Sequence, residues 1–204
     1  MTPRTKAKSE QVRSESRARL VRSARNMFAS KGFFATKVGD IARQAGMSQG
    51  NVYWHFSSKE EILQEILAEG FGAIEIMTAE VADAPGTSRG KLDLLIERTL
   101  ALYAQYGEFA RILGSLMGQG GQELMASLGF NMAEIGARYH ANLERVFAQA
   151  RREKAVADVE PDSLVRSYFS FFNGALITYP DWWSQLDPSL IRRTVLRMLG
   201  AATG

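Results

Sequence analysis

Residues 40–56 read DIARQAGMSQGNVYWHF, and this stretch decides the fold of the first third of the chain. A helical pattern over residues 38–45 ends at Gly46, a residue type that commonly terminates helices. Ser48 is a residue type that caps the start of a helix, and a second helical pattern follows it over residues 49–56. Two short helices joined by a glycine-containing turn predict a helix-turn-helix.

The apolar residues of this stretch predict how the two helices pack against each other. Ile41, Ala42 and Val52 are expected to form the small core between them. Ala42 matters because only a small side chain lets the two helix backbones approach closely. In a DNA-binding helix-turn-helix, the second helix lies in the major groove and presents its N-terminal residues to the base edges.

The residues at the start of the second helix have side chains that suit base reading. Gln49 and Asn51 are residue types that read adenine through paired hydrogen bonds. Ser48 is adaptable as a donor or acceptor, and Gly50 allows the backbone to approach the DNA closely. We therefore expect base contacts at these four positions.

The residues that follow predict contacts with the DNA backbone. Tyr53, His55 and Lys59 carry donors that can reach phosphate oxygens. Ser58 and Glu61 have the spacing of a capping box, in which each side chain satisfies a backbone donor of the other residue. The amino end of the helix that Ser58 begins is itself expected to attract anions.

The charge of the chain is distributed unevenly. The 204 residues include 25 Lys and Arg and 22 Asp and Glu, which gives a formal net charge of +3. Residues 1–59 hold twelve Lys and Arg against three Asp and Glu, a net charge of +9, so the remainder carries −6. This asymmetry points to nucleic acid or an anionic membrane as partner, and a merely solvated basic helix is the alternative.

Composition narrows the function classes further. With 46% hydrophobic residues the chain can bury a core, and without cysteine it has no disulfide, thiol catalysis or thiolate metal site. His55 and His140 are the two histidines, so we expect no metal site. No catalytic constellation and no cofactor motif can be assembled, and no apolar run is long enough to cross a bilayer. We therefore expect a soluble, cytoplasmic protein that is not an enzyme and has no membrane partner.

Helical periodicity extends over nearly the whole chain, and no strand pattern of useful length interrupts it. Pro161 and Pro188 are placed as first-turn residues of helices. The GQGG stretch over residues 118–121 lacks the Lys-Ser/Thr of a phosphate loop and is interpreted as a turn. The prediction is an all-α chain of about nine helices, over residues 11–31, 38–45, 49–56 and 59–80, around 92–103, 109–117 and 124–147, and over 161–179 and 188–199.

Residues 11–67 resemble the DNA-binding domain of the TetR family of bacterial transcriptional regulators. The resemblance rests on residues 24–28 (ARNMF), 32–33 (GF), 40–48 (DIARQAGMS) and 51–60 (NVYWHFSSKE). It is specific because the turn, the groove helix, the phosphate anchors and the helix cap occur in register. It implies a three-helix DNA-binding domain (11–67) and a helical ligand-binding and dimerisation domain (68–204), and we expect residues 1–10 before them to form a flexible basic arm.

The resemblance also implies site residues. The family's base-reading positions fall on Ser48, Gln49, Gly50 and Asn51, and its phosphate contacts fall on Thr36, Lys37, Tyr53, His55 and Lys59. The chain departs from the family at residues 37–39 (KVG), because the family usually has Ser or Thr followed by a polar residue there. Either Thr36 or Lys37 is therefore expected to cap the helix over 38–45.

The C-terminal two thirds is expected to bind a ligand and to form a homodimer, as in the family. The last two helices have more apolar surface than one helix pair normally buries, and pairing with a second copy would cover it. Met and aromatic residues of the middle helices suit an adaptable apolar pocket, although a stripe at helical spacing is more often core. The predicted dimer residues are Leu164, Tyr168, Phe172, Leu176, Ile191, Val195 and Met198, and the predicted pocket residues are Tyr103, Phe109, Arg111, Leu113, Met117, Met125, Phe130, Met132, His140 and Trp182.

Two hypotheses about function follow. The first is a homodimeric repressor that binds a near-palindromic operator and is released by a small, largely apolar effector. The alternative is a DNA-binding protein that does not switch, or one that is regulated by a protein partner. A packed body without a cavity would favour the alternative.

Overall fold

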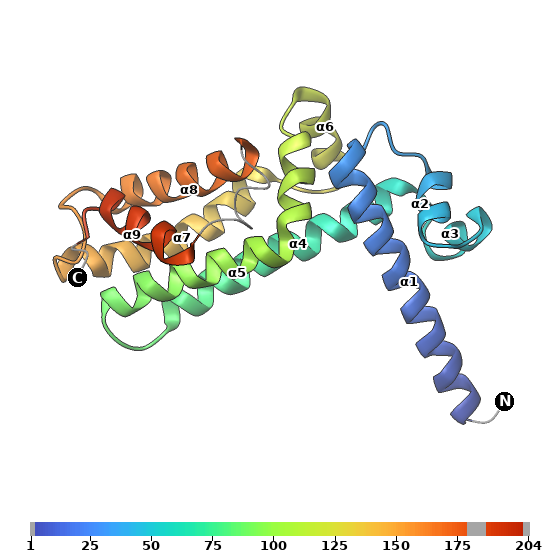
Figure 1. Cartoon of the computed structure of the whole chain (residues 1–204), viewed down its shortest axis with the longest axis horizontal. Helices are drawn as coiled ribbons and strands as arrows, with labels where there is room; N and C mark the ends of the chain where they lie inside the picture. The colour runs from blue at the N-terminus through green and yellow to red at the C-terminus, as the bar shows by residue number, and fades with distance from the viewer. Residues whose placement is uncertain (1–2, 179–186, 202–204) are drawn as a thin grey trace. The chain divides into compact units, whose positions relative to one another are not determined.

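The computed structural model of the protein describes residues 3–178 and 187–201, and all regular structure within them is α-helical (Figure 1). The predicted all-α fold class is confirmed, with nine helices among the described residues. In chain order they are α1 (Pro3–Lys31), α2 (Val38–Gln44), α3 (Gln49–His55), α4 (Lys59–Asp83), α5 (Ser88–Ser115), α6 (Gln119–Ser127), α7 (Met132–Arg152), α8 (Pro161–Thr178) and α9 (Pro188–Met198).

The chain forms two compact units. Unit 1 consists of Met1–Glu69 and Ile112–Leu128, and unit 2 consists of Gly70–Arg111 and Gly129–Gly204. The N-terminal unit therefore ends close to the predicted boundary at residue 67. It also includes the end of α5 and the whole of α6, which the sequence had assigned to the C-terminal domain.

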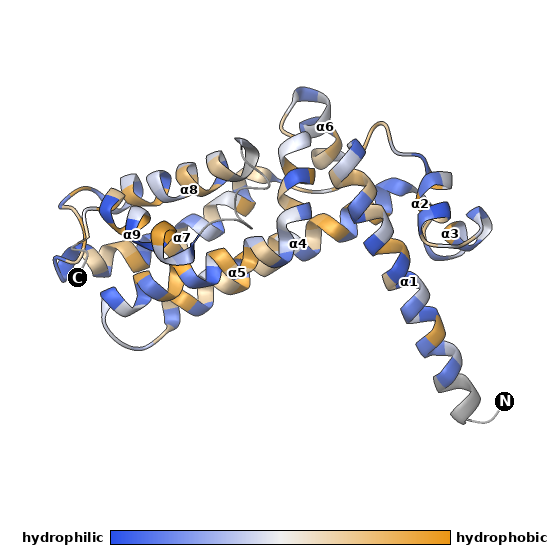
Figure 2. Cartoon of the chain, in the orientation of Figure 1, coloured by the Kyte–Doolittle hydropathy of each residue, from blue (hydrophilic) through white to orange (hydrophobic). Residues whose placement is uncertain are grey.

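Helix α1 begins at Pro3, so residues 3–10 are helical and not the flexible arm that we expected. Proline is favoured in the first turn of a helix, and most of the residues that follow it are good helix formers. The side chain of Gln11 also donates a hydrogen bond of 3.0 Å to Glu15, one turn later. Figure 2 shows that hydrophilic positions predominate along the coloured part of the N-terminal half of α1.

Helices α2 and α3 form the predicted helix-turn-helix. Ile41, Ala42 and Val52 are all buried, as expected for the core between the two helices. Gly46 has a φ of +65°, which explains why glycine occupies the turn. The hydroxyl of Ser48 accepts a hydrogen bond of 3.2 Å from the backbone N–H of Asn51, which confirms the predicted cap of α3.

The predicted capping box at the start of α4 is half right. Ser58 Oγ accepts a hydrogen bond of 3.2 Å from the backbone N–H of Glu61, as expected. Glu61, however, does not return the interaction to Ser58. Its carboxylate accepts hydrogen bonds from the backbone N–H of Ser57 at 2.6 Å and from the hydroxyl of Ser57 at 2.8 Å. These two hydrogen bonds hold the pKa of Glu61 below its ordinary value.

The middle of the chain shows two corrections to the predicted helices. The segments on either side of Gly107 form one helix, α5, with a kink at Tyr106 instead of a break. The long helix predicted over 124–147 is divided into α6 and α7 at Gly129, whose φ is +86°. Asn131 then caps α7 by accepting hydrogen bonds from the backbone N–H groups of the next residues, Ala133 and Glu134.

The GQGG stretch is the start of α6 and not a turn. Gly118 caps the helix, and the remaining three residues belong to it. A Cβ atom at Gly121 would lie 2.3 Å from the carbonyl oxygen of Leu116. Glycine is therefore required there by a close approach of the backbone and not by binding of a phosphate.

The core of unit 2 contains most of the residues that we had predicted at a dimer interface. Tyr168 lies in this core, where its hydroxyl is within 2.6 Å of the Thr99 hydroxyl. Burial raises the pKa of Tyr168 well above its ordinary value. The prediction was wrong because an apolar helical stripe does not show whether its own chain or a second copy covers it. The buried residues are Leu164, Tyr168, Phe172, Ile191 and Val195; Met198 is exposed, and the side chain of Leu176 lies outside the described residues.

Among residues 3–178 and 187–201, no helix has the length and apolar character needed to cross a membrane.

Candidate nucleic-acid interface

The four predicted base-reading residues lie together at the exposed start of α3. Ser48, Gln49, Gly50 and Asn51 are all exposed to solvent. Ser48 Oγ is already used as an acceptor by the N–H of Asn51, which fixes the first turn of α3. Gln49 and Asn51 retain side-chain amides for base edges. The structure therefore places these residues where base contacts require them, and the contacts themselves remain a prediction.

Gly39 of α2 controls the space beside Gln49. A Cβ atom added at Gly39 would lie 3.0 Å from Nε2 of Gln49 and 3.6 Å from its Cδ. The family usually has a polar side chain at this position, and its absence here leaves room for the amide of Gln49. Glycine at position 39 is thus linked to the placement of one predicted base-reading side chain.

The question of which residue caps α2 is settled in favour of Lys37. The backbone of Lys37 is extended at the start of α2, and its N–H donates a 3.4 Å hydrogen bond to the carboxylate of Asp40. Thr36 is only 1% exposed, and its hydroxyl donates to the carbonyl oxygen of Gly32 at 2.7 Å. The predicted phosphate contact of the Thr36 side chain is therefore wrong, whereas the side chain of Lys37 is exposed.

Tyr53 and Trp54 present large aromatic surfaces to solvent on α3. Tyr53 is 56% exposed and Trp54 is 62% exposed, so neither ring belongs to the core. The guanidinium of Arg13, from α1, lies 4.7 Å from the centre of the Trp54 ring. Sequence reasoning missed this pair, because the two residues are far apart in the chain and no motif links them.

His55 is partly buried beside two cationic side chains. Its Nδ1 atom is buried and has no hydrogen-bond partner within the described part of the chain. Burial lowers the pKa of His55, and the nearby charges of Arg13 and Arg17 lower it further. The imidazole is therefore mainly neutral at neutral pH in the free protein, and an approaching phosphate would favour its protonation.

Lys59 holds the loop before α2 in place. Its ammonium donates hydrogen bonds to the carbonyl oxygens of Phe33 at 2.9 Å and Thr36 at 3.0 Å. The same ammonium lies 4.3 Å from the centre of the Phe33 ring. An ammonium has three donors, so two are engaged inside unit 1 and one remains for a phosphate. Sequence reasoning predicted the phosphate contact but not this internal role.

Two arginines of α1 are paired with acidic residues of α4. Arg17 forms an ion pair with Glu65 and lies 4.6 Å from the centre of the Phe56 ring, and Arg25 forms an ion pair with Glu69. These pairs stabilise the packing of α1 on α4 within unit 1. Part of the +9 charge of residues 1–59 is thus used internally.

The residues predicted to line an effector pocket are divided between the two units. Leu113, Met117 and Met125 belong to unit 1, whereas Phe109 and Phe130 belong to unit 2. Phe109 and Phe130 pack around Phe71, with ring-centre distances of 5.3 Å and 5.5 Å. Phe109 and Phe130 are therefore used in packing, the interpretation that the sequence had left as the alternative, and a pocket at the other residues remains a prediction. The other predicted pocket residues in unit 2 are Tyr103, Arg111, Met132 and His140, and Trp182 lies outside the described residues.

Two of these residues have well-defined partners within unit 2. The ring centre of Tyr103 lies 5.8 Å from that of Phe172. The hydroxyl of Tyr103 donates a 3.4 Å hydrogen bond to the side-chain oxygen Oδ1 of Asn173. His140 Nε2 lies 2.8 Å from a carboxylate oxygen of Asp162. Arg111 is exposed. Tyr103 and His140 thus have polar partners within unit 2, whereas Arg111 faces solvent.

An open hollow of about 500 Å³ lies elsewhere in unit 2, between α5 and α9. Its walls include Ile96 and Leu100 together with the ion pair between Asp93 and Arg192, whose nearest atoms are 2.7 Å apart. None of the predicted pocket residues within the described ranges lines it. Sequence periodicity alone gave no sign of this hollow.

Comparisons with known proteins agree with the geometry of unit 1. Residues 20–66 match the sequence profile of the tetR family of bacterial regulatory proteins. The HTH-type transcriptional regulator SrpR of Pseudomonas putida is 37% identical over 76 residues, which are 37% of this chain and 34% of SrpR. The match thus spans about a third of that relative.

Solved structures extend the likeness to the fold of most of the chain. The ketosteroid transcriptional regulator KstR2 of Mycobacterium tuberculosis superposes with a TM-score of 0.76 at 21% identity, over 91% of this chain and 95% of KstR2. The TetR family regulator PfmR of Thermus thermophilus superposes with a TM-score of 0.74 at 21% identity, over 91% of this chain and 99% of PfmR.

An N-terminal helix-turn-helix whose second helix begins at an exposed end, followed by a helical domain, is the architecture of the class of helix-turn-helix transcriptional regulators. Within that class, residues 20–66 match the tetR family of bacterial regulatory proteins, and the fold of most of the chain is shared with the solved TetR family regulator PfmR. The members of this family are transcriptional regulators and not enzymes.

Proposed function

We propose that this protein is a transcriptional repressor that binds a near-palindromic DNA operator as a homodimer. The observation that carries the proposal is the exposed start of α3, where Gln49 and Asn51 project from a turn fixed by the Ser48 cap. The cationic residues of the first 59 positions supply attraction to phosphates. Operator binding requires access to the bacterial chromosome, so the proposed location is the cytoplasm.

The proposed dimer uses the exposed faces of α8 and α9, since the buried faces belong to the core of unit 2. On α9, Leu190 is 48% exposed and Met198 is 40% exposed, so apolar surface of this helix is available to a second copy. On α8, Ser163, Ser167, Ser170 and Gly174 recur at helical spacing and are exposed. Small residues at this spacing would allow a second copy of the helix to approach closely.

The proposed operator has two half-sites related by the two-fold axis of the dimer. Their centres are expected about 34–36 Å apart, or a multiple of that distance, because each protomer reads the same face of the DNA. Selection of bound DNA from a random pool by the full-length protein tests this arrangement. An enriched inverted repeat supports the proposal, and the absence of any enriched sequence contradicts it.

The proposed signal for release is a small, largely apolar effector that binds unit 2. A near-complete switch requires the effector to favour the form that does not bind DNA by roughly 10⁴-fold. Long-chain fatty acids are a suitable first probe, because the relatives include the fatty acid metabolism regulator protein of Bacillus subtilis, 33% identical over 86 residues. The test is a titration of these compounds against the complex of the protein with its selected operator.

One observation favours the alternative of a regulator that does not switch or that responds to a protein partner. The rings of Phe109 and Phe130 both pack against the ring of Phe71, so part of the aromatic stripe is used in packing within unit 2. If apolar compounds leave the affinity unchanged while sequence-specific binding persists, the effector part of the proposal fails and this alternative remains.

A further inference from the structure

The first turns of α1 make no contribution to the core of unit 1. Within α1, the first buried residue is Leu20, and every described side chain from Lys8 to Arg19 is at least partly exposed. A helix with so little burial is held mainly by its continuity with the packed part of α1, since short isolated helices are marginal in water. This exposed segment is nevertheless rich in cationic residues, so its surface is available to an anionic partner.

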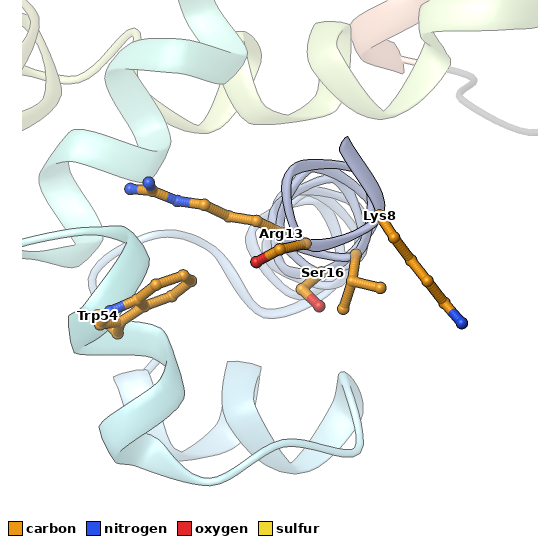
Figure 3. A pocket seen from close by; sticks show the side chains of 6 residues that line it. Lys8, Arg13, Ser16 and Trp54 are labelled. Atoms are coloured by element: carbon orange, nitrogen blue, oxygen red, sulfur yellow. The ribbon is translucent and has the colours of Figure 1, made fainter. Parts of the chain in front are cut away.

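An open hollow of about 390 Å³ lies between this segment and α3. We call it the α1 groove, and Figure 3 shows its surroundings. The residues that α1 contributes to the groove are spaced three and four positions apart along the chain, so they lie on one face of the helix. Arg13 extends from α1 above the ring of Trp54, and Lys8 extends outward from the helix (Figure 3). The groove is lined by Lys8, Ser9, Val12, Arg13, Ser16 and Trp54.

The groove is continuous with the predicted base-reading surface. Trp54 follows Gly50 by four residues and Asn51 by three, and residues at these spacings are neighbours on one face of a helix. DNA that places its bases against the start of α3 therefore brings its adjacent backbone toward Trp54. The side chains that line the opposite wall of the groove are then within reach of that backbone.

The charges of the groove are not neutralised within the described part of the chain. Neither Lys8 nor Arg13 forms an ion pair there, in contrast to Arg17 and Arg25. Glu10 does not line the groove, and Glu15 is engaged with Gln11 at 3.0 Å. The serine hydroxyls in the groove are further donors for an anion.

We propose that the α1 groove binds the sugar–phosphate backbone of the operator beside the bases that α3 reads. This rests on the proposed function, and it adds a second anchoring surface to it. Arg13 and Lys8 supply the charges, and Ser9 and Ser16 supply hydroxyl donors. Trp54 orients the guanidinium of Arg13 by stacking and is a positioning residue.

The state of His55 supports this assignment. Burial is the main cause of the lowered pKa of His55, and the positive charge of Arg13 lowers it further, so the charge of Arg13 acts on the neighbouring imidazole in the free protein. A phosphate in the groove would compensate this charge. The positive charge of the groove thus suits a polyanion. DNA whose bases are read by the adjacent α3 would bring its phosphates to the groove.

The test compares the double variant Lys8→Gln, Arg13→Gln with a charge-matched control, Arg98→Gln, Arg152→Gln, whose residues are exposed in unit 2. The full-length proteins are titrated with the selected operator at several salt concentrations. Log affinity falls as log salt rises, and each lost phosphate contact makes this negative slope shallower by about 0.9. The slope of the double variant is therefore expected to be shallower by about 1.8 per protomer. The control is expected to keep the wild-type slope.

Hydroxyl-radical footprinting of the same complexes gives a second readout. In the double variant, backbone positions beside each half-site are expected to become accessible while the half-site itself stays protected and its preferred sequence is unchanged. An unchanged footprint with an unchanged salt slope would overturn the proposal. If the wild-type protein selects no sequence at all, the proposed function fails as well, so the two failures are distinguishable.

Thermal unfolding of each variant distinguishes a loss of fold from a loss of phosphate contacts. If the double variant unfolds at a lower temperature, Lys8→Gln alone is used, because Lys8 is exposed and forms no ion pair within the described part of the chain. The slope of log affinity against log salt is expected to be shallower by about 0.9 per protomer in the single variant. An unchanged slope overturns the role of Lys8.

Discussion

The ammonium of Lys59 donates a 2.9 Å hydrogen bond to the carbonyl oxygen of Phe33 and lies 4.3 Å from the centre of that residue's ring. The first residue of α4 is thus bound to the loop that precedes the helix-turn-helix. Lys59 therefore helps to hold the DNA-binding helices in place, in addition to any contact that it makes with a phosphate. Its loss is therefore expected to affect unit 1 even without DNA.

Replacing Lys59 by Met tests this internal role. Methionine keeps much of the apolar side chain but donates no hydrogen bond, so we expect unit 1 to lose roughly 1–3 kcal/mol of stability. Affinity for specific and non-specific DNA should fall by the same factor. Denaturant unfolding and DNA titration measure the two effects, and Lys37→Met is the control for stability alone, because Lys37 caps α2 only through its backbone. Unchanged stability would show that Lys59 acts only on DNA.

Replacing Gly39 by Ala is expected to change base preference without weakening the fold. The added Cβ lies 3.0 Å from Nε2 of Gln49 and must displace that amide by a few tenths of an ångström. Alanine also favours the helical state of α2 by about 1 kcal/mol relative to glycine. We therefore expect a more stable protein whose preference changes at one base pair in each half-site.

The matched control is Gly136→Ala, at a helical glycine whose added Cβ meets no atom within 4 Å. It should gain stability and keep the wild-type base preference. If both variants show the same preference as the wild type in a repeated DNA selection, Gly39 has no part in placing Gln49.

DNA affinity is expected to increase as the pH falls through the titration range of His55. In the free protein, burial and the charges of Arg13 and Arg17 lower the pKa of His55. A phosphate raises the pKa in the complex, so the complex binds more protons than the free protein between the two values. Protonation therefore favours binding at lower pH.

Titrations between about pH 5.5 and pH 7.5, where histidine ordinarily changes charge, measure this dependence. His55→Gln should reduce it, because glutamine does not titrate. An equal pH dependence in the variant and the wild type would show that His55 does not contact phosphate.

Exposed and buried residues of the last helix are expected to differ in what their substitution disrupts. Leu190→Glu places a charge on the exposed face of α9 and should dissociate the dimer while leaving the monomer folded. Ile191→Ala removes a buried side chain and should destabilise unit 2 by about 2–5 kcal/mol. Sedimentation and thermal unfolding of both variants separate the effects. A dimeric Leu190→Glu variant would contradict the proposed interface.

Removal of one buried hydroxyl tests the assignment of Tyr168 to the core. Tyr168→Phe leaves the Thr99 hydroxyl without its partner at 2.6 Å, so we expect a loss of about 1–3 kcal/mol in stability. The oligomeric state should be unchanged, because Tyr168 is buried inside its own chain. A change of oligomeric state with unchanged stability would restore the original prediction of an interface residue.

The helix-turn-helix could be predicted because its signals are local. The turn at Gly46 requires a positive φ, and the cap at Ser48 involves a residue only three positions away. The break between α6 and α7 was also marked locally, by Gly129 and by the capping residue Asn131. The apolar stripe continues across this break and concealed it, and the kink at Tyr106 had no comparable marker.

The rest of the site depends on contacts between residues that are distant in the chain. The tie between Lys59 and Phe33 and the stacking of Arg13 on Trp54 arise only after α1, α3 and α4 have packed. Apolar periodicity likewise shows that a helix face is covered, but not what covers it. The predicted interface residue Phe172 was therefore assigned to a second copy although its own chain buries it.

The central claim is that the start of α3 reads bases, and Gln49→Ala tests it most directly. The affinity of the wild type and the variant is measured for the selected operator and for each of its single base-pair substitutions. We predict that the variant loses discrimination of about 1–3 kcal/mol at one base pair in each half-site and keeps the wild-type pattern at every other position. A uniform loss of affinity at all positions, with the full pattern of discrimination retained, would contradict the claim.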